Sequence, residues 1–262
     1  MSPPAATRWF YGINLGRWGR DLGKTASPAD LGLAGLVRQI FAQTALPRLR
    51  LSSIEPMDWS SGLIGLMAEF GSNRLAPHAH LPLQSGSDAV LRRMHRRYRP
   101  WHYVQKVEAL LHAAGPDLTL GADVMAGFPG ETDAEFEETL ALVRALPFGY
   151  LHLFPFSPRP ATPAWALHAE KPIPAAVVDQ RMAALRQLAA EKTYAHRSRF
   201  LHKQVDAITL HTPPELAARA RTAALTANFL PVEIDCALPP NRLVRITVAS
   251  LTPDHSLDTR LA

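Results

Sequence analysis

Short apolar runs alternate with amphipathic stretches through the first three-quarters of the chain. The apolar runs predict strands at 9–13, 49–54, 78–83, 118–125 and 150–156. Between them, apolar residues recur at helical spacing and predict helices at 27–41, 60–70, 104–114 and 132–143. Strands and helices that alternate in this way are typical of a parallel sheet covered by helices.

Capping residues support two of these helices. Ser27 can cap a helix that has Pro28 at its first position. Thr132 and Glu135 have the spacing of a capping box, in which each side chain accepts a hydrogen bond from the other residue's backbone. We therefore expect one helix to begin near Ser27 and another at Thr132.

The pattern changes towards the C-terminus. A proline-rich connection at 155–174 and a long basic helix at 175–203 are followed by short strands at 205–210, 231–234 and 243–248. We divide the chain into an α/β part at 1–203 and a small all-β module at 204–262. The α/β part could form a barrel or an open doubly wound sheet. The barrel is favoured because no glycine-rich dinucleotide fingerprint follows a strand.

Small and polar residues follow each predicted strand, which is how a barrel builds a pocket at its C-terminal mouth. The strings are LSSIEP at 51–56, HLPLQSGSD at 80–88, GFPGET at 127–132 and FPFSPRPATPA at 154–164. Within the third, residues 128–131 predict a type II turn with Gly130 at the position of positive φ. Such a turn can serve ligand binding or simply connect a strand to a helix.

These strings, in this order and spacing, resemble the radical-SAM methylthiotransferases that modify tRNA and a ribosomal protein. The likeness covers residues 8 to 250. The first and last strings are most similar to the branch that modifies threonylcarbamoyladenosine next to the tRNA anticodon, whereas related enzymes act on isopentenyl-adenosine or on a ribosomal aspartate. The resemblance implies a partial (β/α) barrel, here lacking its first strand, and a TRAM-like RNA-binding module.

The resemblance also implies S-adenosylmethionine as cofactor and tRNA as partner. The residues that would lie near S-adenosylmethionine are Asn14, Ser52, Glu55, Gln84, Ser85, Asp123 and Gly127.

Cysteine content departs from this family. Its members carry a CxxxCxxC loop after the first barrel strand, which holds a 4Fe–4S cluster, and an N-terminal domain with three more cysteines for a second cluster. This chain has one cysteine, Cys236, so the ligands of both clusters are absent and no disulfide can form within the chain. We expect the chain to be inactive as it stands. It would then be a truncated or decayed product, a non-catalytic RNA-binding remnant, or the C-terminal half of a split enzyme whose missing N-terminal chain carries the clusters.

The chain is basic, with a formal net charge of +5. Five arginines lie within eight residues around Tyr98: Arg92, Arg93, Arg96, Arg97 and Arg99. Guanidinium groups suit phosphates and an aromatic ring can stack on a base, so this segment is a candidate RNA contact, with a solvated helix end as the alternative. Basic residues of the long helix extend this surface: Arg181, Arg186, Lys192, Arg197, Arg199 and Lys203.

His78 and His80 are two residues apart on a predicted strand and therefore face the same side. They could begin a metal site of a cluster-free enzyme, or they could be ordinary pocket histidines. No apolar run reaches the length of about 18 residues that a membrane span needs, and the first residues lack a secretory signal. We therefore expect a cytoplasmic protein with no membrane partner.

Overall fold

The computed structural model describes residues 8–10, 15–19, 32–51, 53–71, 73–251 and 257–262. The α/β part contains five strands: β1 Arg8–Phe10, β2 Leu49–Leu51, β3 His78–His80, β4 Thr119–Ala126 and β5 Phe148–Pro155. Its helices are η1 Leu15–Arg17, α1 Gly32–Gln43, η2 Pro56–Asp58, α2 Ser61–Phe70, α3 Asp88–Arg93, α4 Pro100–Ala114, α5 Asp133–Ala145, α6 Pro163–Glu170 and α7 Ala175–Ser198. The module contains β6 Gln204–Thr209, α8 Pro214–Ala217, β7 Thr222–Thr226, β8 Pro231–Ile234, β9 Leu243–Leu251 and β10 Leu257–Leu261.

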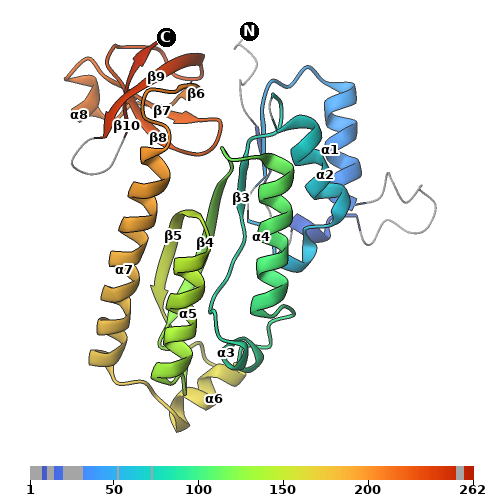
Figure 1. Cartoon of the computed structure of the whole chain (residues 1–262), viewed down its shortest axis with the longest axis vertical. Coiled ribbons are helices and arrows are strands. Elements are labelled where there is room, and N and C mark those ends of the chain that lie inside the picture. The colour runs from blue at the N-terminus through green and yellow to red at the C-terminus, as the bar shows by residue number, and fades with distance from the viewer. Residues whose placement is uncertain (1–7, 11–14, 20–31, 52, 72, 252–256) are drawn as a thin grey trace.

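The strands of the α/β part run parallel. β1 pairs with β2, and β3, β4 and β5 pair in that order. The two groups are joined where the Ala76 N–H donates to the Leu49 carbonyl at 2.8 Å and the Ile54 N–H donates to the His80 carbonyl at 3.1 Å. Figure 1 shows the helices of this part on one side of the strands, with the module at the end where β4 and β5 begin. The parallel α/β architecture expected from the pattern is therefore confirmed.

The strands and helices expected from the pattern are present in the described residues, with shifted ends. Ser60 caps α2, and the capping box of Thr132 and Glu135 begins α5. The type II turn is also present, because Gly130 has a φ of 71° and the Glu131 N–H donates to the Phe128 carbonyl at 2.9 Å. The expected helix start at Ser27 lies outside the described residues.

The proline-rich connection is not wholly irregular, as the pattern had suggested. It contains α6, because Thr162 caps the helix and Pro163 occupies its first position, where a missing N–H costs nothing. Two strands of the module, β7 and β10, were also missed. In the described part of the chain, no helix is long and apolar enough to cross a membrane.

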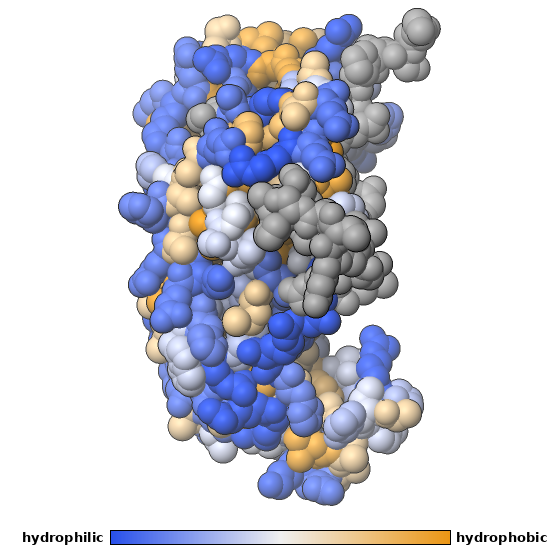
Figure 2. All heavy atoms as spheres, turned by 90° about the vertical axis from the view of Figure 1, so that its right-hand side faces the viewer, coloured by the Kyte–Doolittle hydropathy of each residue, from blue (hydrophilic) through white to orange (hydrophobic). Residues whose placement is uncertain are grey.

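The two parts have separate hydrophobic cores. The larger lies between the strands and the helices that cover them, and the smaller fills the module. In the module the strands close into a barrel in the order β10, β8, β7, β6, β9. On the helix side of the α/β part, Figure 2 shows mostly hydrophilic surface over its lower half, consistent with amphipathic helices that turn their apolar stripes to the core.

Candidate active site on the inner face of the sheet

Side chains alternate between the two faces of each strand, and one face is buried against the helices. Leu49 and Leu51 of β2, Ala79 of β3, and Ala122 and Val124 of β4 belong to the core. The residues between them therefore face the other side, away from the covering helices. We call the polar set on that side the inner-face cluster: Arg50, His78, His80, Asp123, Tyr150 and His152.

Tyr150 connects two members of the cluster. Its hydroxyl lies 2.8 Å from His78 Nε2 and 3.0 Å from His80 Nδ1. Gly121 on the neighbouring strand makes room for the ring, because a Cβ there would lie 2.1 Å from Tyr150 Cζ. A side chain at position 121 would therefore displace the tyrosine from both histidines.

Asp123 lies between two imidazoles. Its Oδ1 atom is 3.2 Å from His80 Nε2 and 3.3 Å from His152 Nδ1. Burial raises the pKa of Asp123, but hydrogen bonding and the charge of His80, followed by the same effects of His152, lower that pKa below its ordinary value. Burial, followed by the charge of Arg50, holds the pKa of His78 well below its ordinary value. Asp123 is therefore ionised and His78 neutral near pH 7.

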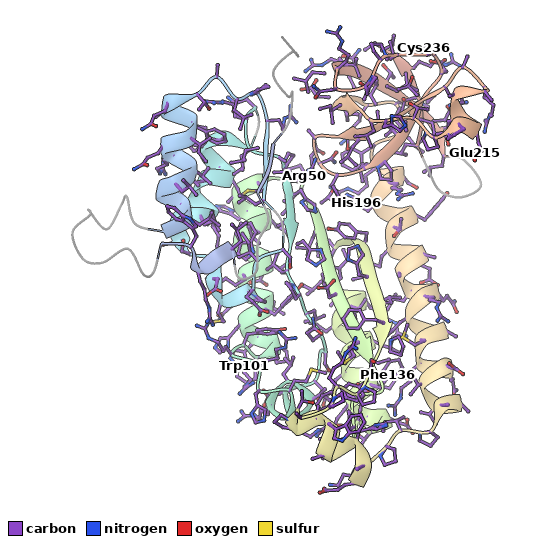
Figure 3. The ribbon with its side chains drawn as sticks, turned by 180° about the vertical axis from the view of Figure 1, so that it is seen from behind. Arg50, Trp101, Phe136, His196, Glu215 and Cys236 are labelled. Atoms are coloured by element: carbon purple, nitrogen blue, oxygen red, sulfur yellow. The ribbon has the colours of Figure 1, made fainter. Side chains whose placement is uncertain are left out.

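The module closes one end of the cluster. The Phe229 ring lies 4.4 Å from the His78 ring and 5.3 Å from the Tyr150 ring, measured between centroids. Arg50, only 2% exposed, donates from Nη2 to the carbonyls of Thr226 and Ala227, both at 3.0 Å. Figure 3 shows Arg50 at the end of the sheet next to the module. The turn after β7 is therefore part of the site.

The carboxyl ends of the strands form the opposite end, which we call the mouth. A cavity of about 370 Å³ lies there between the segment after α3 and the start of α6. It is lined by Arg93, Met94, His95, Arg96, Met125, Phe128, Thr162, Pro163 and Ala164. A second cavity of about 160 Å³ shares His95 and Arg96 and is bordered by Glu55. The larger has the size and mixed apolar and charged lining of a small-molecule site.

The GFPGET loop at the mouth is held by a buried ion pair. Glu131 Oε2 accepts the Gly127 N–H at 2.8 Å and lies 2.9 Å from Arg181 Nη1 on α7. Burial raises the pKa of Glu131 above its ordinary value, and the Gly127 and Arg181 contacts oppose that rise. A Cβ on Gly127 would lie 2.6 Å from a Val178 methyl group, so this glycine lets α7 approach the loop.

The residues expected near S-adenosylmethionine are only partly brought together. Asn14 and Ser52 lie outside the described residues. Glu55 is at the mouth, whereas Asp123 lies among the histidines, and Gln84 forms backbone hydrogen bonds with β4. Ser85 is fully buried with its hydroxyl 3.0 Å from that of Thr139 on α5, so it faces the helices.

Sequence reasoning missed Arg50, Tyr150 and His152. The sequence signal that could have found Tyr150 and His152 is the alternation of side chains along β5, because these two residues are two positions apart and face the same side.

The arginine segment is paired with carboxylates. The contacts are Arg92–Asp88 at 2.9 Å, Arg93–Glu135 at 2.7 Å, Arg96–Glu55 at 3.0 Å, Arg97–Asp58 at 3.6 Å and Arg99–Asp88 at 3.2 Å. The side chains of Arg92 and Arg97 are nevertheless 61% and 53% exposed. Base stacking by Tyr98 is a wrong expectation, because the ring is fully buried and its hydroxyl donates to the Pro82 and Leu83 carbonyls. Arg181 is likewise buried and does not extend a basic surface.

Part of the chain matches a known family, and most of it is similar to known relatives. Residues 32–143, which include His80 and Asp123, match the Radical SAM superfamily. The chain is 39% identical over 197 residues to the tRNA-2-methylthio-N(6)-dimethylallyladenosine synthase of Cereibacter sphaeroides strain ATCC 17023, covering 75% of this chain and 42% of the relative. It is 37% identical over 193 residues to the threonylcarbamoyladenosine tRNA methylthiotransferase of Thermotoga maritima, covering 74% of this chain and 42% of the relative. The chain belongs to the radical-SAM methylthiotransferase family.

A third methylthiotransferase relative matches over most of the chain. The tRNA-2-methylthio-N(6)-dimethylallyladenosine synthase of Parafrankia sp. strain EAN1pec is 33% identical over 255 residues, covering 94% of this chain and 50% of the relative. The chain thus spans about half the length, or less, of these relatives.

The iron–sulfur cluster that the family implies does not fit the residues of this methylthiotransferase chain. A 4Fe–4S cluster is held by several thiolates, whereas the chain has one cysteine, Cys236. Cys236 follows β8 in the module, and its carbonyl accepts a hydrogen bond from the Thr222 hydroxyl. Figure 3 shows it at the end of the module that is far from the mouth. No step of the reaction can therefore be assigned to a cluster held by these residues.

Proposed function

We propose that this chain forms the S-adenosylmethionine-binding and RNA-binding part of a tRNA methylthiotransferase that acts on N6-threonylcarbamoyladenosine. The observation that carries the proposal is the polarity of the inner face. Imidazoles, a carboxylate and a phenol line the surface beside the mouth, and a threonylcarbamoyl group offers an amide, a hydroxyl and a carboxylate to pair with them. A dimethylallyl group is a hydrocarbon and would leave these groups without hydrogen bonds, which is costly when they lose water.

In this proposal the mouth receives S-adenosylmethionine, which supplies the methyl group. Glu55, Gln84 and Gly127 would lie around it, whereas Asp123, which belongs to the same expected set, lies between His80 and His152 on the inner face. Asn14, Ser52 and Ser85 belong to the same expected set by the family resemblance, although the hydroxyl of Ser85 is occupied by Thr139. The larger mouth cavity supports this assignment, because Met125 and Phe128 offer apolar contact while Arg93 and Arg96 offer charge.

The RNA would contact both ends of the chain. The exposed guanidinium groups of Arg92 and Arg97 can reach phosphates at the mouth, with Arg93, Arg96 and Arg99 behind them in ion pairs. The C-terminal module would act as a TRAM-like RNA-binding barrel, since small closed β-barrels commonly bind oligonucleotides. The phosphate contacts would make the affinity depend strongly on salt.

The test compares three anticodon stem-loops that differ only in one adenosine: threonylcarbamoylated, dimethylallylated or unmodified. We expect fluorescence anisotropy to show at least about tenfold tighter binding of the threonylcarbamoylated RNA, a difference of about 1.4 kcal/mol. Equal or tighter binding of the dimethylallylated RNA would overturn the substrate assignment.

A titration calorimetry experiment with S-adenosylmethionine separates the enzyme part from an RNA-binding remnant. Binding of S-adenosylmethionine to the purified chain, weakened by Glu55→Ala, supports the proposal. RNA binding without any S-adenosylmethionine binding supports the remnant instead.

A further inference from the structure

Three ligand atoms converge in the inner-face cluster, and none of them is a thiolate. They are His80 Nε2, Asp123 Oδ1 and His152 Nδ1, which lie within 4.8 Å of one another. We propose that these three atoms bind a divalent transition-metal ion such as Zn²⁺, at a site separate from any iron–sulfur cluster. Two imidazoles and one carboxylate are a donor set that suits Zn²⁺, Co²⁺ and Fe²⁺.

The spacing of the donors fits an ion between them. In a tetrahedral zinc site with bonds of about 2.0–2.1 Å, neighbouring donor atoms lie about 3.4 Å apart. Asp123 Oδ1 is 3.2 Å from His80 Nε2 and 3.3 Å from His152 Nδ1. Charge-assisted hydrogen bonds between a nitrogen and a carboxylate are usually shorter, at about 2.7–2.9 Å. The side chains would therefore need little movement to coordinate a metal.

A second layer of contacts orients one ligand. His80 uses its other nitrogen, Nδ1, to contact the Tyr150 hydroxyl at 3.0 Å, and that hydroxyl contacts His78 Nε2 at 2.8 Å. Metal-binding histidines typically make such a contact through the nitrogen that does not bind the metal. When His80 Nδ1–H donates to Tyr150 and Tyr150 donates to His78, the lone pair of His80 Nε2 is left for the ion.

The reverse direction of the same hydrogen bonds describes the metal-free site. His78 Nε2–H then donates to Tyr150, Tyr150 donates to His80 Nδ1, and His80 Nε2–H faces Asp123. Metal binding therefore reverses the chain of donors and changes the tautomer of His78, a residue that does not touch the ion. The tautomer of His78 can therefore report metal binding from a residue that is not itself a ligand.

The site is closed on one side and open on the other. The His80 side chain is 8% exposed, whereas that of His152 is 62% exposed. Three protein ligands with solvent on one side resemble catalytic zinc sites, in which the fourth position holds water or substrate. We therefore expect an exchangeable ion that can bind a further oxygen ligand.

The experiment uses the full chain without an affinity tag, titrated with Co²⁺ and then with Zn²⁺. We expect one equivalent of Co²⁺ to give ligand-field absorption that Zn²⁺ abolishes. His152→Ala and Asp123→Asn should each weaken Co²⁺ binding by at least 100-fold, and Tyr150→Phe by about 10-fold to 100-fold. His112→Ala, which removes an exposed histidine of α4, is the matched control and should change nothing.

Circular dichroism of each variant verifies that it is folded, and His152 is exposed enough that its replacement leaves the core intact. Nitrogen NMR of the wild type should show His78 change tautomer when Zn²⁺ is added. The proposal is overturned if the wild type takes up no Co²⁺ at about 100 μM free metal. It is also overturned if His112→Ala weakens binding as much as His152→Ala does.

Discussion

Replacing His196 by glutamine should remove much of the pH dependence of stability between pH 7 and pH 5. His196 lies on α7, is 4% exposed, and has its Nε2 atom 2.9 Å from the Thr119 hydroxyl at the start of β4. It fits against Gly149, where a Cβ would lie 2.8 Å from the imidazole. Burial, followed by the charges of Arg199 and Arg197, lowers the pKa of His196 to about 4.

The sign follows from proton uptake. With a folded pKa of about 4 and an unfolded pKa of about 6.5, the unfolded chain binds more protons between these values. The stabilisation is therefore present above pH 6.5 and is lost as the pH falls towards 4. Integration between pH 7 and pH 5 gives a loss of about 2 kcal/mol from this one group.

Urea denaturation followed by tryptophan fluorescence measures the effect. All five tryptophans lie in the α/β part, where α7 packs on β4 and β5. The wild type should lose about 2 kcal/mol more free energy of unfolding between pH 7 and pH 5 than His196→Gln, with equal denaturant slopes. His78 titrates in both proteins and cancels in the comparison. An equal loss in the two proteins would refute the assignment of a low pKa to His196.

Four further substitutions test the packing of the site, one of them a control. Arg50→Leu removes two charge-assisted hydrogen bonds to module carbonyls and should cost about 3 kcal/mol or more, seen as faster hydrogen exchange at the joint between the two parts. Gly121→Ala should cost about 1–3 kcal/mol in a urea melt, because the new methyl group overlaps the half-buried ring of Tyr150. Gly65→Ala, on α2 with nothing within 4 Å of the new Cβ, should instead be neutral or stabilising by up to about 1 kcal/mol. Glu131→Gln removes the negative charge that pairs with the buried Arg181 guanidinium, and losing this ion pair should cost about 3–5 kcal/mol. The melting temperature should therefore fall. An unchanged melting temperature would contradict a stabilising role for this pair.

Elements with a strong local period were predictable from the sequence. The parallel strands, the helices that cover them and the capping box of α5 follow from apolar spacing and cap residues. The turn that begins with Phe128 follows from its proline and glycine. The location of α6 was obscured by prolines, although Pro163 stands where a helix tolerates one.

The site was less predictable, because its contacts join distant parts of the chain. The arginine segment contains many charges, but nothing local shows that Glu55, Asp58 and Glu135 lie beside it. Gln84 and Ser85 were both expected near S-adenosylmethionine. Ser85 instead continues the buried alternate positions Leu81 and Leu83, and its hydroxyl contacts Thr139 on α5.

The module's turn has a consequence for recombination between relatives. Two separate hydrophobic cores suggest that a crossover near residue 203 would yield a viable chimera. The contacts of this turn indicate the opposite. Arg50 of the α/β part donates hydrogen bonds to the Thr226 and Ala227 carbonyls of the module, and the Phe229 ring packs on His78. A chimera would keep both cores yet lose this joint, unless Arg50 and residues 226–229 are inherited from the same parent.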